Sequence, residues 1–487
     1  MTVQTERAAV AEPPRTGDAG APSPVRRLLN RSPLALLLFL MALVAQVGAQ
    51  PLNNGDAWFH LRAGHLFWGS WSLWHPGAPT RFATSAWVPT QWSTEMLTAK
   101  VEDWFGLPGV AFFYGLVYLA FLVAVYGACR RLSGPLAGAV ATGAAVFAAS
   151  TTLSARPQVV SLVLIAVTVD AWWRTRADGR LRWWLLPMTW VWATAHGLWT
   201  AGVLVSLACW LGLALEGRLR GRVGRAFLVP LGSLVAATLT PLGPKLLLSQ
   251  LAVSERTPMI AEWGATSFRT VPALVVGVMV AVLLVLWLRG ERVGAMPLLL
   301  LVLACGWAAL VTRLVAPAAV LVAPLLAQAL TERLRRRTRV PTDRVERVVV
   351  ALAALACVAG LAAAVPSSAD RAAGVPDAFA PRLAALPRGS AVLVEDSSGA
   401  WMEWRFPGVQ PVIDGLLDSY SVAYMRRFDT FWRAEPGWRG FVADSGARNA
   451  VMLAGSPATT ALVEEAHWRV VQRDAPWVYL VAPGGAR

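Results

Sequence analysis

Apolar runs of roughly 20 residues, separated by short clusters of arginine, constrain the fold of this chain more than any other feature. A run of that length spans the hydrocarbon core of a bilayer as a helix, and basic residues between spans collect on the cytoplasmic side. The composition agrees, because 56% of the 487 residues are hydrophobic and only 15% are charged. These values are typical of a polytopic membrane protein. We therefore expect an all-α polytopic membrane bundle.

The positions of the arginines predict how often the chain crosses the membrane. Lysine is nearly absent, with Lys100 and Lys245 the only two, so arginine carries the topology signal. All basic clusters fall on one side if there are about eleven transmembrane helices, with the N-terminus in the cytoplasm and the C-terminus outside. The clusters lie at 26–31, 130–131, 174–182, 218–225, 289–292 and 333–347. We expect a multi-pass protein of the cell membrane and no nucleic acid as a partner, despite the net charge of +15.

Composition divides the chain into three parts. Residues 1–24 are rich in alanine, proline and charge without an apolar period, which predicts a disordered N-terminal tail. Residues 25–365 form the transmembrane domain, with a long, tryptophan-rich first outer loop at 50–106. The positive flank of the first apolar run is compatible with a signal peptide, but the long leader and many later spans favour an uncleaved helix. Residues 366–487 have the composition of a soluble, extracytoplasmic domain.

The pattern in this C-terminal domain predicts alternating strands and helices, and hence a small α/β domain. Buried strands are expected at Ala391–Asp396, Val409–Asp414 and Asn449–Ala454, helices at Ser421–Arg433 and Pro457–Glu465, and two more strands around a turn at Arg473–Pro476. Ser456 is the expected N-cap of the second helix, because proline follows it at the first helical position.

The stretch NNGDAWFHLRAG, from Asn53 to Gly64, carries the densest chemistry of the first outer loop. Asp56 and His60 are four residues apart, so on a helix they share one face. A carboxylate beside an imidazole at the membrane surface suits proton chemistry or the binding of a charged head group. The alternative is a helix that rests on the membrane and whose Asp56 caps the first turn.

Other polar residues also map to the outer side of the predicted topology. Together with Asp56 and His60 they are Arg62, Arg156, Gln158, His196, Glu262 and Arg313. Charges near the hydrocarbon are costly and usually mark a site, although each residue alone is also compatible with snorkelling or capping. We expect Asp56, His60, Arg156, His196 and Arg313 to converge on one outer cavity.

The residue types predict roles in such a cavity. Asp56 is the candidate general base, or a carboxylate that fixes the acceptor. Arg156 and Arg313 offer guanidinium donors to a phosphate or diphosphate. His60 and His196 would orient or protonate the phosphate leaving group, and Trp58 would offer a face on which a sugar stacks.

Other kinds of site are not indicated by the sequence. It contains no Walker loop, Rossmann fingerprint, HExxH or CxxC, so no nucleotide cofactor is expected. The four cysteines lie inside apolar runs, where neither a disulfide nor a metal motif is indicated.

These residues carry a resemblance. GDAWFHLRAGHLFW followed by WVPTQWSTEML resembles the first outer loop of a widespread family of bacterial membrane proteins, which typically reads D-x-D-x-W-W-H-L-x-x-G and then W-x-x-H-E-W-L-x-E. VIDGLLDSYSVAYMRRF in the tail is similar to the family's I-D-G-R-x-D-x-Y. The chain has Asn54, Thr90-Gln91 and Leu416 where the family has Asp, His-Glu and Arg.

That family in turn resembles the GT-C glycosyltransferases, which include protein mannosyltransferases and the catalytic subunits of oligosaccharyltransferase. The resemblance implies a polyprenyl-phosphate sugar donor, an unknown glycan or protein acceptor, and Asp56 at the family's acidic position. A divalent cation is a candidate cofactor, although the substituted acids weaken a two-carboxylate site.

Two hypotheses follow from the sequence. The first is an outward-facing glycosyltransferase that uses a lipid-phosphate sugar donor. The second is a non-catalytic membrane protein that binds or moves a lipid-linked glycan, or organises envelope assembly through its tail. An ion-coupled transporter is less favoured, because paired halves with interrupted helices are not evident.

Overall fold

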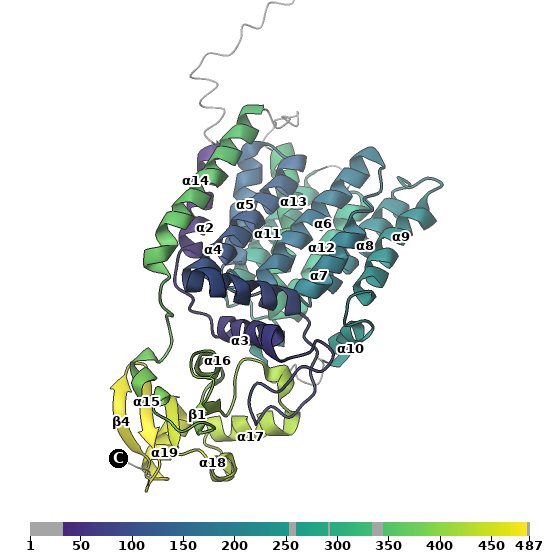
Figure 1. Cartoon of the computed structure of the whole chain (residues 1–487). Coiled ribbons are helices and arrows are strands. Elements are labelled where there is room, and N and C mark those ends of the chain that lie inside the picture. Colours follow the sequence, from purple (N-terminus) through teal and green to yellow (C-terminus); the bar gives the residue numbers. More distant parts are fainter. Residues whose placement is uncertain (1–32, 253–259, 291–292, 334–343, 485–487) are drawn as a thin grey trace, which may run out of the picture.

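The computed structural model describes residues 33–252, 260–290, 293–333 and 344–484, so the predicted tail at 1–24 lies outside the described residues. Helices form a bundle, and a small mixed domain built around a sheet lies beyond one end of it (Figure 1). Two segments lie between these parts, namely helix α3 (Gly55–Gly69) and the first turns of α4.

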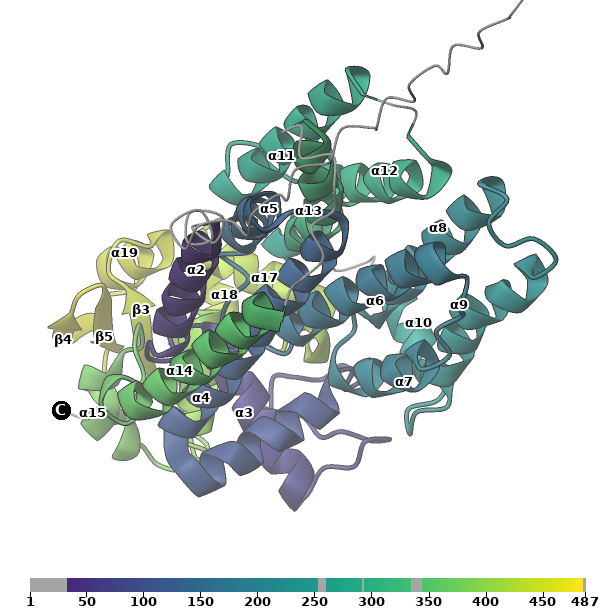
Figure 2. The same cartoon turned by 90° about the horizontal axis from the view of Figure 1, so that it is seen from above.

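The predicted spans coincide with bundle helices. These are α2 (Pro33–Gly48), α4 (Trp92–Leu132), α5 (Pro135–Ala148), α6 (Gln158–Asp178), α7 (Leu185–Ala195), α8 (Trp199–Leu215), α9 (Val223–Thr238), α11 (Val271–Leu288), α12 (Ala295–Leu310), α13 (Val315–Arg333) and α14 (Arg344–Ser368). Four helical segments in the described residues are long and apolar enough to cross a membrane, and five more apolar helices are shorter. The count of about eleven spans therefore stays a prediction. Seen from above, α2, α4 and α14 form one edge of the bundle, and α7, α8 and α9 form another (Figure 2).

Helix α4 changes direction at Gly106, where the backbone is non-helical with φ of 65°. Glycine tolerates this left-handed conformation, and Pro108 cannot donate a backbone hydrogen bond to the preceding turn. The part of α4 before the bend lies across the end of the bundle, and the part after it runs through the bundle (Figure 1). Much of the predicted first outer loop is thus helical.

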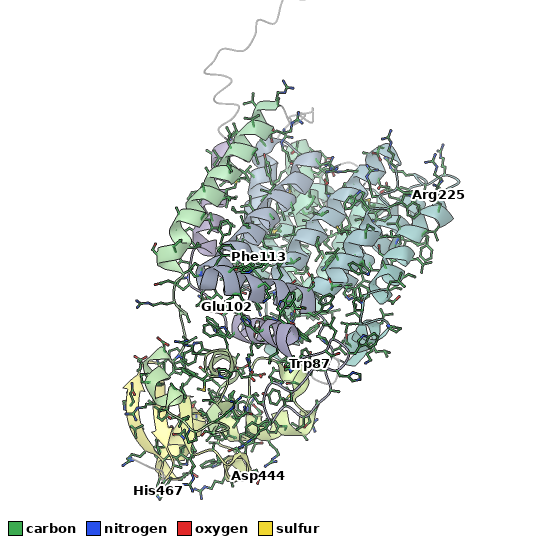
Figure 3. The ribbon with its side chains drawn as sticks, in the orientation of Figure 1. Trp87, Glu102, Phe113, Arg225, Asp444 and His467 are labelled. Atoms are coloured by element: carbon green, nitrogen blue, oxygen red, sulfur yellow. The ribbon has the colours of Figure 1, made fainter. Side chains whose placement is uncertain are left out.

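Charged side chains of the bundle are concentrated at its two ends. At the end away from the sheet, Arg130 binds Glu346 at 2.7 Å, with both side chains buried. Arg176 binds Glu216 at 2.9 Å, and Arg225 is labelled at this same end in Figure 3. Because α14 starts at Glu346's end and leads to the C-terminal domain, the arginines described at this end, Arg130, Arg176 and Arg225, lie at the end opposite that domain.

The C-terminal domain contains a five-stranded sheet of order β2-β1-β3-β5-β4, in which the β3–β5 and β4–β5 pairs are antiparallel. The strands are β1 (Ala391–Val394), β2 (Gln410–Pro411), β3 (Asn449–Leu453), β4 (Arg469–Asp474) and β5 (Trp477–Val481), and the longer helices are α16 (Asp396–Arg405), α17 (Val422–Trp432), α18 (Trp438–Ser445) and α19 (Pro457–Glu464). The predicted cap of α19 is confirmed, since the Ser456 side chain accepts from the Thr459 N–H.

Two predictions for this domain were wrong in extent. The strand expected at 409–414 is only two residues long, because Pro411 has no N–H to extend a ladder and Asp414 accepts from the Leu416 N–H in a turn. The strand expected at 391–396 ends at Val394. Glu395 then caps a helix that the sequence pattern did not predict, α16, by accepting from the N–H groups of Ser397 and Ser398.

Helix α3 joins the C-terminal domain to the bundle. Gly55 lies so close to Ser397 of α16 that an added Cβ would be 2.5 Å from the serine Cβ. Gly415 lies equally close to Phe59, with 2.6 Å from an added Cβ to the ring. The rings of Trp58 and Trp404 lie 4.8 Å apart in the same contact. These contacts hold the turn after β2 against the N-terminal half of α3.

Candidate functional site

A cavity of about 490 Å³ lies between the end of the bundle and the C-terminal domain. Trp87, one of its lining residues, is labelled between the two parts in Figure 3. Of the residues predicted from the sequence, the lining includes Asp56, His60, Arg156, Gln158, His196, Glu262 and Arg313. The prediction that scattered polar residues converge on one cavity is confirmed; their roles stay predictions.

Trp58 and Arg62 do not line the cavity. They are four residues apart and share a face of α3 that turns toward the C-terminal domain. Trp58 is 1% exposed, and its ring packs on Trp404, so it presents no face to a sugar in this structure. Arg62 lies within electrostatic reach of Glu403 of α16. Sequence reasoning did not predict that this face of α3 contacts the C-terminal domain.

Asp56 is not the N-cap of its helix, so the capping role in the alternative from the sequence is wrong, while the position of this helix on the membrane stays a prediction. Asn54 is the N-cap, and its side chain accepts from the Asp56 N–H at 3.0 Å. The Asp56 carboxylate is therefore available to the cavity, at the positive end of the helix dipole.

Arg156 bridges two carboxylates. Its Nη1 donates to Asp56 Oδ2 at 2.8 Å and to Glu262 Oε1 at 2.9 Å, while its Nε donates to Ser154 at 2.9 Å. The guanidinium side chain is 8% exposed, whereas the two carboxylates are 39% and 40% exposed toward the cavity. Arg156 thus fixes the positions of both acids.

The two carboxyl groups respond differently to this environment. Burial raises the pKa of Asp56, and the charge of Arg156 offsets only part of that effect. Burial also acts on Glu262, but Arg156 and Arg313 together outweigh it and lower the pKa of Glu262. The same arginines therefore stabilise the charged form of Glu262 more effectively than that of Asp56.

Arg313 is the second cation of the cavity. It lies in the short turn between α12 and α13, as the sequence predicted, and its Nη1 is 3.5 Å from Glu262 Oε2. Its guanidinium lies over the Trp263 ring, with 5.2 Å from Cζ to the ring centroid. Ion pairing and stacking hold this group in place while other donors point toward the cavity.

His60 has a partner that sequence reasoning missed. Its Nδ1 lies 2.8 Å from Oε1 of Glu95, and both side chains are buried. Burial, with the nearby charges of Arg156 and Arg313, lowers the pKa of His60 well below its usual value. The available signal was the last Glu of WVPTQWSTE, which matches the final Glu of W-x-x-H-E-W-L-x-E.

The C-terminal domain also contributes to the lining, through Asp396 at the start of α16 and through Leu416 and Asp418 after β2. Asp396 is accessible to solvent in the cavity yet surrounded by protein atoms. Burial, with the neighbouring Glu395, raises its pKa to about 6. Sequence reasoning assigned no site residue to this domain, although IDGLLDSY carries part of the family resemblance.

Comparison with known proteins identifies the fold. No protein-family model and no curated protein sequence matches the chain. Among solved structures, the oligosaccharyltransferase of Archaeoglobus fulgidus aligns with a TM-score of 0.56 at 12% identity, covering 86% of this chain and 69% of that chain. The same enzyme, AglB, with an inhibitory peptide and a dolichol-phosphate aligns at 0.55 and 14% identity, covering 96% and 75%.

ArnT from Cupriavidus metallidurans, bound to undecaprenyl phosphate, aligns with a TM-score of 0.52 at 15% identity, covering 95% of this chain and 99% of that chain. These structural neighbours are GT-C fold glycosyltransferases. The fold expected from the resemblance is therefore confirmed.

The residues of the cavity do not fit a metal ion as they are arranged. One neighbour, a crystal structure of the Archaeoglobus enzyme, contains zinc and sulfate. In the described part of this chain, no three side chains of His, Cys, Asp or Glu are grouped as metal ligands. Asp56 and Glu262 each give one carboxylate oxygen to Arg156, and this positive charge lies between them where a cation would have to bind.

Proposed function

We propose that this protein is a membrane glycosyltransferase that moves a sugar from a polyprenyl-phosphate donor to an acceptor on the outer side of the membrane. The donor class is suggested by the neighbours, whose structures contain dolichol-phosphate and undecaprenyl phosphate. The acceptor is a glycan or protein. The C-terminal domain is proposed to be extracytoplasmic, since it lies at the end opposite Arg130, Arg176 and Arg225, which belong to three of the arginine clusters.

The observation that carries the proposal is the convergence of Arg156, Arg313 and Asp56 on one cavity, although they lie far apart in the sequence. Two guanidinium groups beside a carboxylate of raised pKa provide both an anion site and a proton acceptor.

In the proposed reaction, Arg313 and Arg156 hold the donor phosphate and stabilise the charge that develops on it. Asp56 fixes the acceptor hydroxyl or takes its proton. The acceptor oxygen then forms a bond to the anomeric carbon while the bond from that carbon to the phosphate oxygen breaks, and the electron pair leaves with the polyprenyl phosphate. No step uses a metal.

The binding step is tested with undecaprenyl phosphate and the purified full-length protein, by native mass spectrometry. Arg313→Ala should weaken binding about ten- to a hundredfold, because charge-assisted hydrogen bonds contribute roughly 1.5–3 kcal/mol. Arg225→Ala, at the opposite end of the bundle, is the matched control and should bind like the wild type. An equal loss of affinity in both variants, or no binding by the wild type, would contradict the proposal that the cavity binds the donor.

A second candidate function is a non-catalytic protein that binds a lipid-linked glycan. It is favoured by one observation, namely that an oxygen of Asp56 is already occupied by Arg156. The two functions differ in what Asp56 must do, because only an enzyme needs its carboxylate to take a proton in the transition state.

A further inference from the structure

A buried chain of hydrogen bonds leads from α7 to the cavity. Trp192 Nε1 lies 2.7 Å from Ser161 Oγ, and Ser161 Oγ lies 2.9 Å from His196 Nδ1. Trp192 and Ser161 are fully buried, and His196 is 3% exposed. The backbone N–H of Leu198 points at the same ring nitrogen, at 3.2 Å.

The direction of these bonds follows from the groups themselves. The indole N–H of Trp192 can only donate, so Ser161 Oγ accepts from it. The Ser161 hydroxyl then has its own hydrogen to donate to His196 Nδ1. Because the Leu198 N–H also donates there, Nδ1 is an acceptor and carries no hydrogen. A neutral imidazole with a bare Nδ1 carries its hydrogen on Nε2.

His196 Nε2 faces the cavity beside Arg313, with 3.4 Å from Nε2 to Nη2 of the arginine. In the tautomer with a bare Nε2, Arg313 Nη2 would donate to the imidazole. The two donors on Nδ1 select the tautomer with hydrogen on Nε2, and in that tautomer neither atom accepts from the other. A second positive charge so close to the guanidinium would be repelled, which keeps the imidazole neutral. Two donors that lie side by side at the cavity can share one acceptor, and an oxygen of an anion would satisfy both.

We propose that Ser161 and Trp192 are positioning residues, which hold His196 as a neutral donor that binds the phosphate of a lipid-phosphate donor together with Arg313. This inference rests on the proposed function, whose phosphate site it details. It assigns His196 to hydrogen bonding alone: the imidazole donates from Nε2 in the ground state and the transition state and transfers no proton.

The test uses the full-length protein and undecaprenyl phosphate as the probe. His196→Leu should lower affinity about tenfold, because the donor is lost. His196→Gln should keep most of the affinity, since its amide nitrogen can reach the position of Nε2. Ser161→Ala should lower affinity about three- to tenfold while leaving His196 in place. Trp192→Phe keeps the Ser161 hydroxyl, so this variant should lose less affinity than Ser161→Ala.

A pH series separates a neutral donor from a charged group. The groups that face His196 are Arg313, Arg156 and His60, with Ser161 and Trp192 behind it. The ratio of wild-type affinity to that of His196→Gln should stay constant between pH 6 and 8, as the phosphate titrates equally in both. A ratio that grows as the pH falls would mean that an imidazolium binds the anion, and would overturn the proposal.

The failure of this inference differs from the failure of the proposed function. If the wild type does not bind undecaprenyl phosphate, the phosphate site itself is absent, and both the proposed function and this inference are refuted. If the wild type binds and Arg313→Ala does not, while His196→Leu and Ser161→Ala bind normally, the proposed function stands and the positioning role is refuted. Thermal unfolding of each variant in detergent shows that the fold is retained.

Discussion

At the scale of single residues, two of the titratable groups that line the cavity, Asp56 and His60, are supported differently. Asp56 is tied through Arg156 to Glu262, which also pairs with Arg313, so it belongs to a network of four charges. His60 has Glu95 behind its Nδ1, which leaves Nε2 toward the cavity. The two histidines therefore have different partners at Nδ1: His60 has Glu95, whose pKa burial raises to about 8, and His196 has the Ser161 hydroxyl.

The role of Asp56 separates an enzyme from a binding protein. A carboxylate that takes a proton acts in the transition state, so Asp56→Asn should abolish complementation of a deletion strain while the protein still binds undecaprenyl phosphate. A binding protein would tolerate the amide, which preserves shape and can donate as well as accept. Protein level is checked by immunoblot, with Asp444→Asn on the exposed far side as the control. Full rescue by Asp56→Asn at normal abundance would leave only the binding function.

The pKa of Asp396 predicts a pH dependence. Because its pKa is raised to about 6, Asp396 is mostly neutral at pH 5 and negatively charged at pH 8. Above its pKa it adds a negative charge to a cavity that we propose to bind phosphate. Asp396→Asn should therefore tighten undecaprenyl phosphate binding at pH 8, by up to about fivefold, and change nothing at pH 5. Equal effects at both pH values would mean that the Asp396 charge is not the cause.

At the scale of elements, close contacts between helices depend on glycine. Gly48 at the end of α2 faces Gly115 of α4, and an added Cβ at Gly48 would lie 2.6 Å from the Gly115 Cα. Leu361 of α14 packs on the same two glycines. Small residues allow such close approach between membrane helices, where packing replaces the hydrophobic effect as the stabilising interaction.

This contact can be tested by a pair of matched substitutions. Gly48→Ala should lower the thermal unfolding temperature in detergent, since overpacking costs about 1–3 kcal/mol. Gly127→Ala in α4 is the control, because no heavy atom lies within 4 Å of the added Cβ. There the better helix propensity of alanine should leave the temperature unchanged or raise it. A Gly48 variant as stable as the Gly127 variant would show that the helices can separate without cost.

The elements that the sequence predicted are those with a local cause. Apolar runs of helical length became the bundle helices, and Ser456 before Pro457 became a helix cap. Asn54 was read as a departure from the family pattern, yet its cap on α3 leaves the Asp56 carboxylate facing the cavity. The short strand at Gln410–Pro411 and the helix after Glu395 depend on turn geometry that no periodicity records.

The site was predictable to the extent that topology constrains it. Charges at the outer ends of spans must share the outer side, which predicted the convergence of Asp56, Arg156 and Arg313. Pairwise side-chain contacts could not be predicted from the sequence, because they depend on packing between segments that are distant in the chain. Glu95 lies behind His60, and Asp396 reaches the cavity from a domain hundreds of residues away.

At the scale of the whole molecule, the decisive property is the polarity of the bundle. Ion pairs such as Arg130–Glu346 and Arg176–Glu216 collect at one end, and the cavity and the C-terminal domain lie at the other. Arginine clusters remain on the cytoplasmic side during insertion. The cavity is therefore predicted to lie at the extracytoplasmic surface of the cell membrane. A lipid-phosphate donor could enter it there from the bilayer.

Reporter fusions test this orientation. A fluorescent protein that folds in the cytoplasm should be active when fused after Gly179, in the turn that follows α6 at the arginine end. Alkaline phosphatase, which requires the outer compartment, should be active when fused after Gly484, beyond β5. Exchanging the two reporters should abolish both signals, because each would then lie on the wrong side. Active phosphatase at both positions would contradict the polarity of the bundle, and the cavity would then have no assigned side from which to receive a lipid donor.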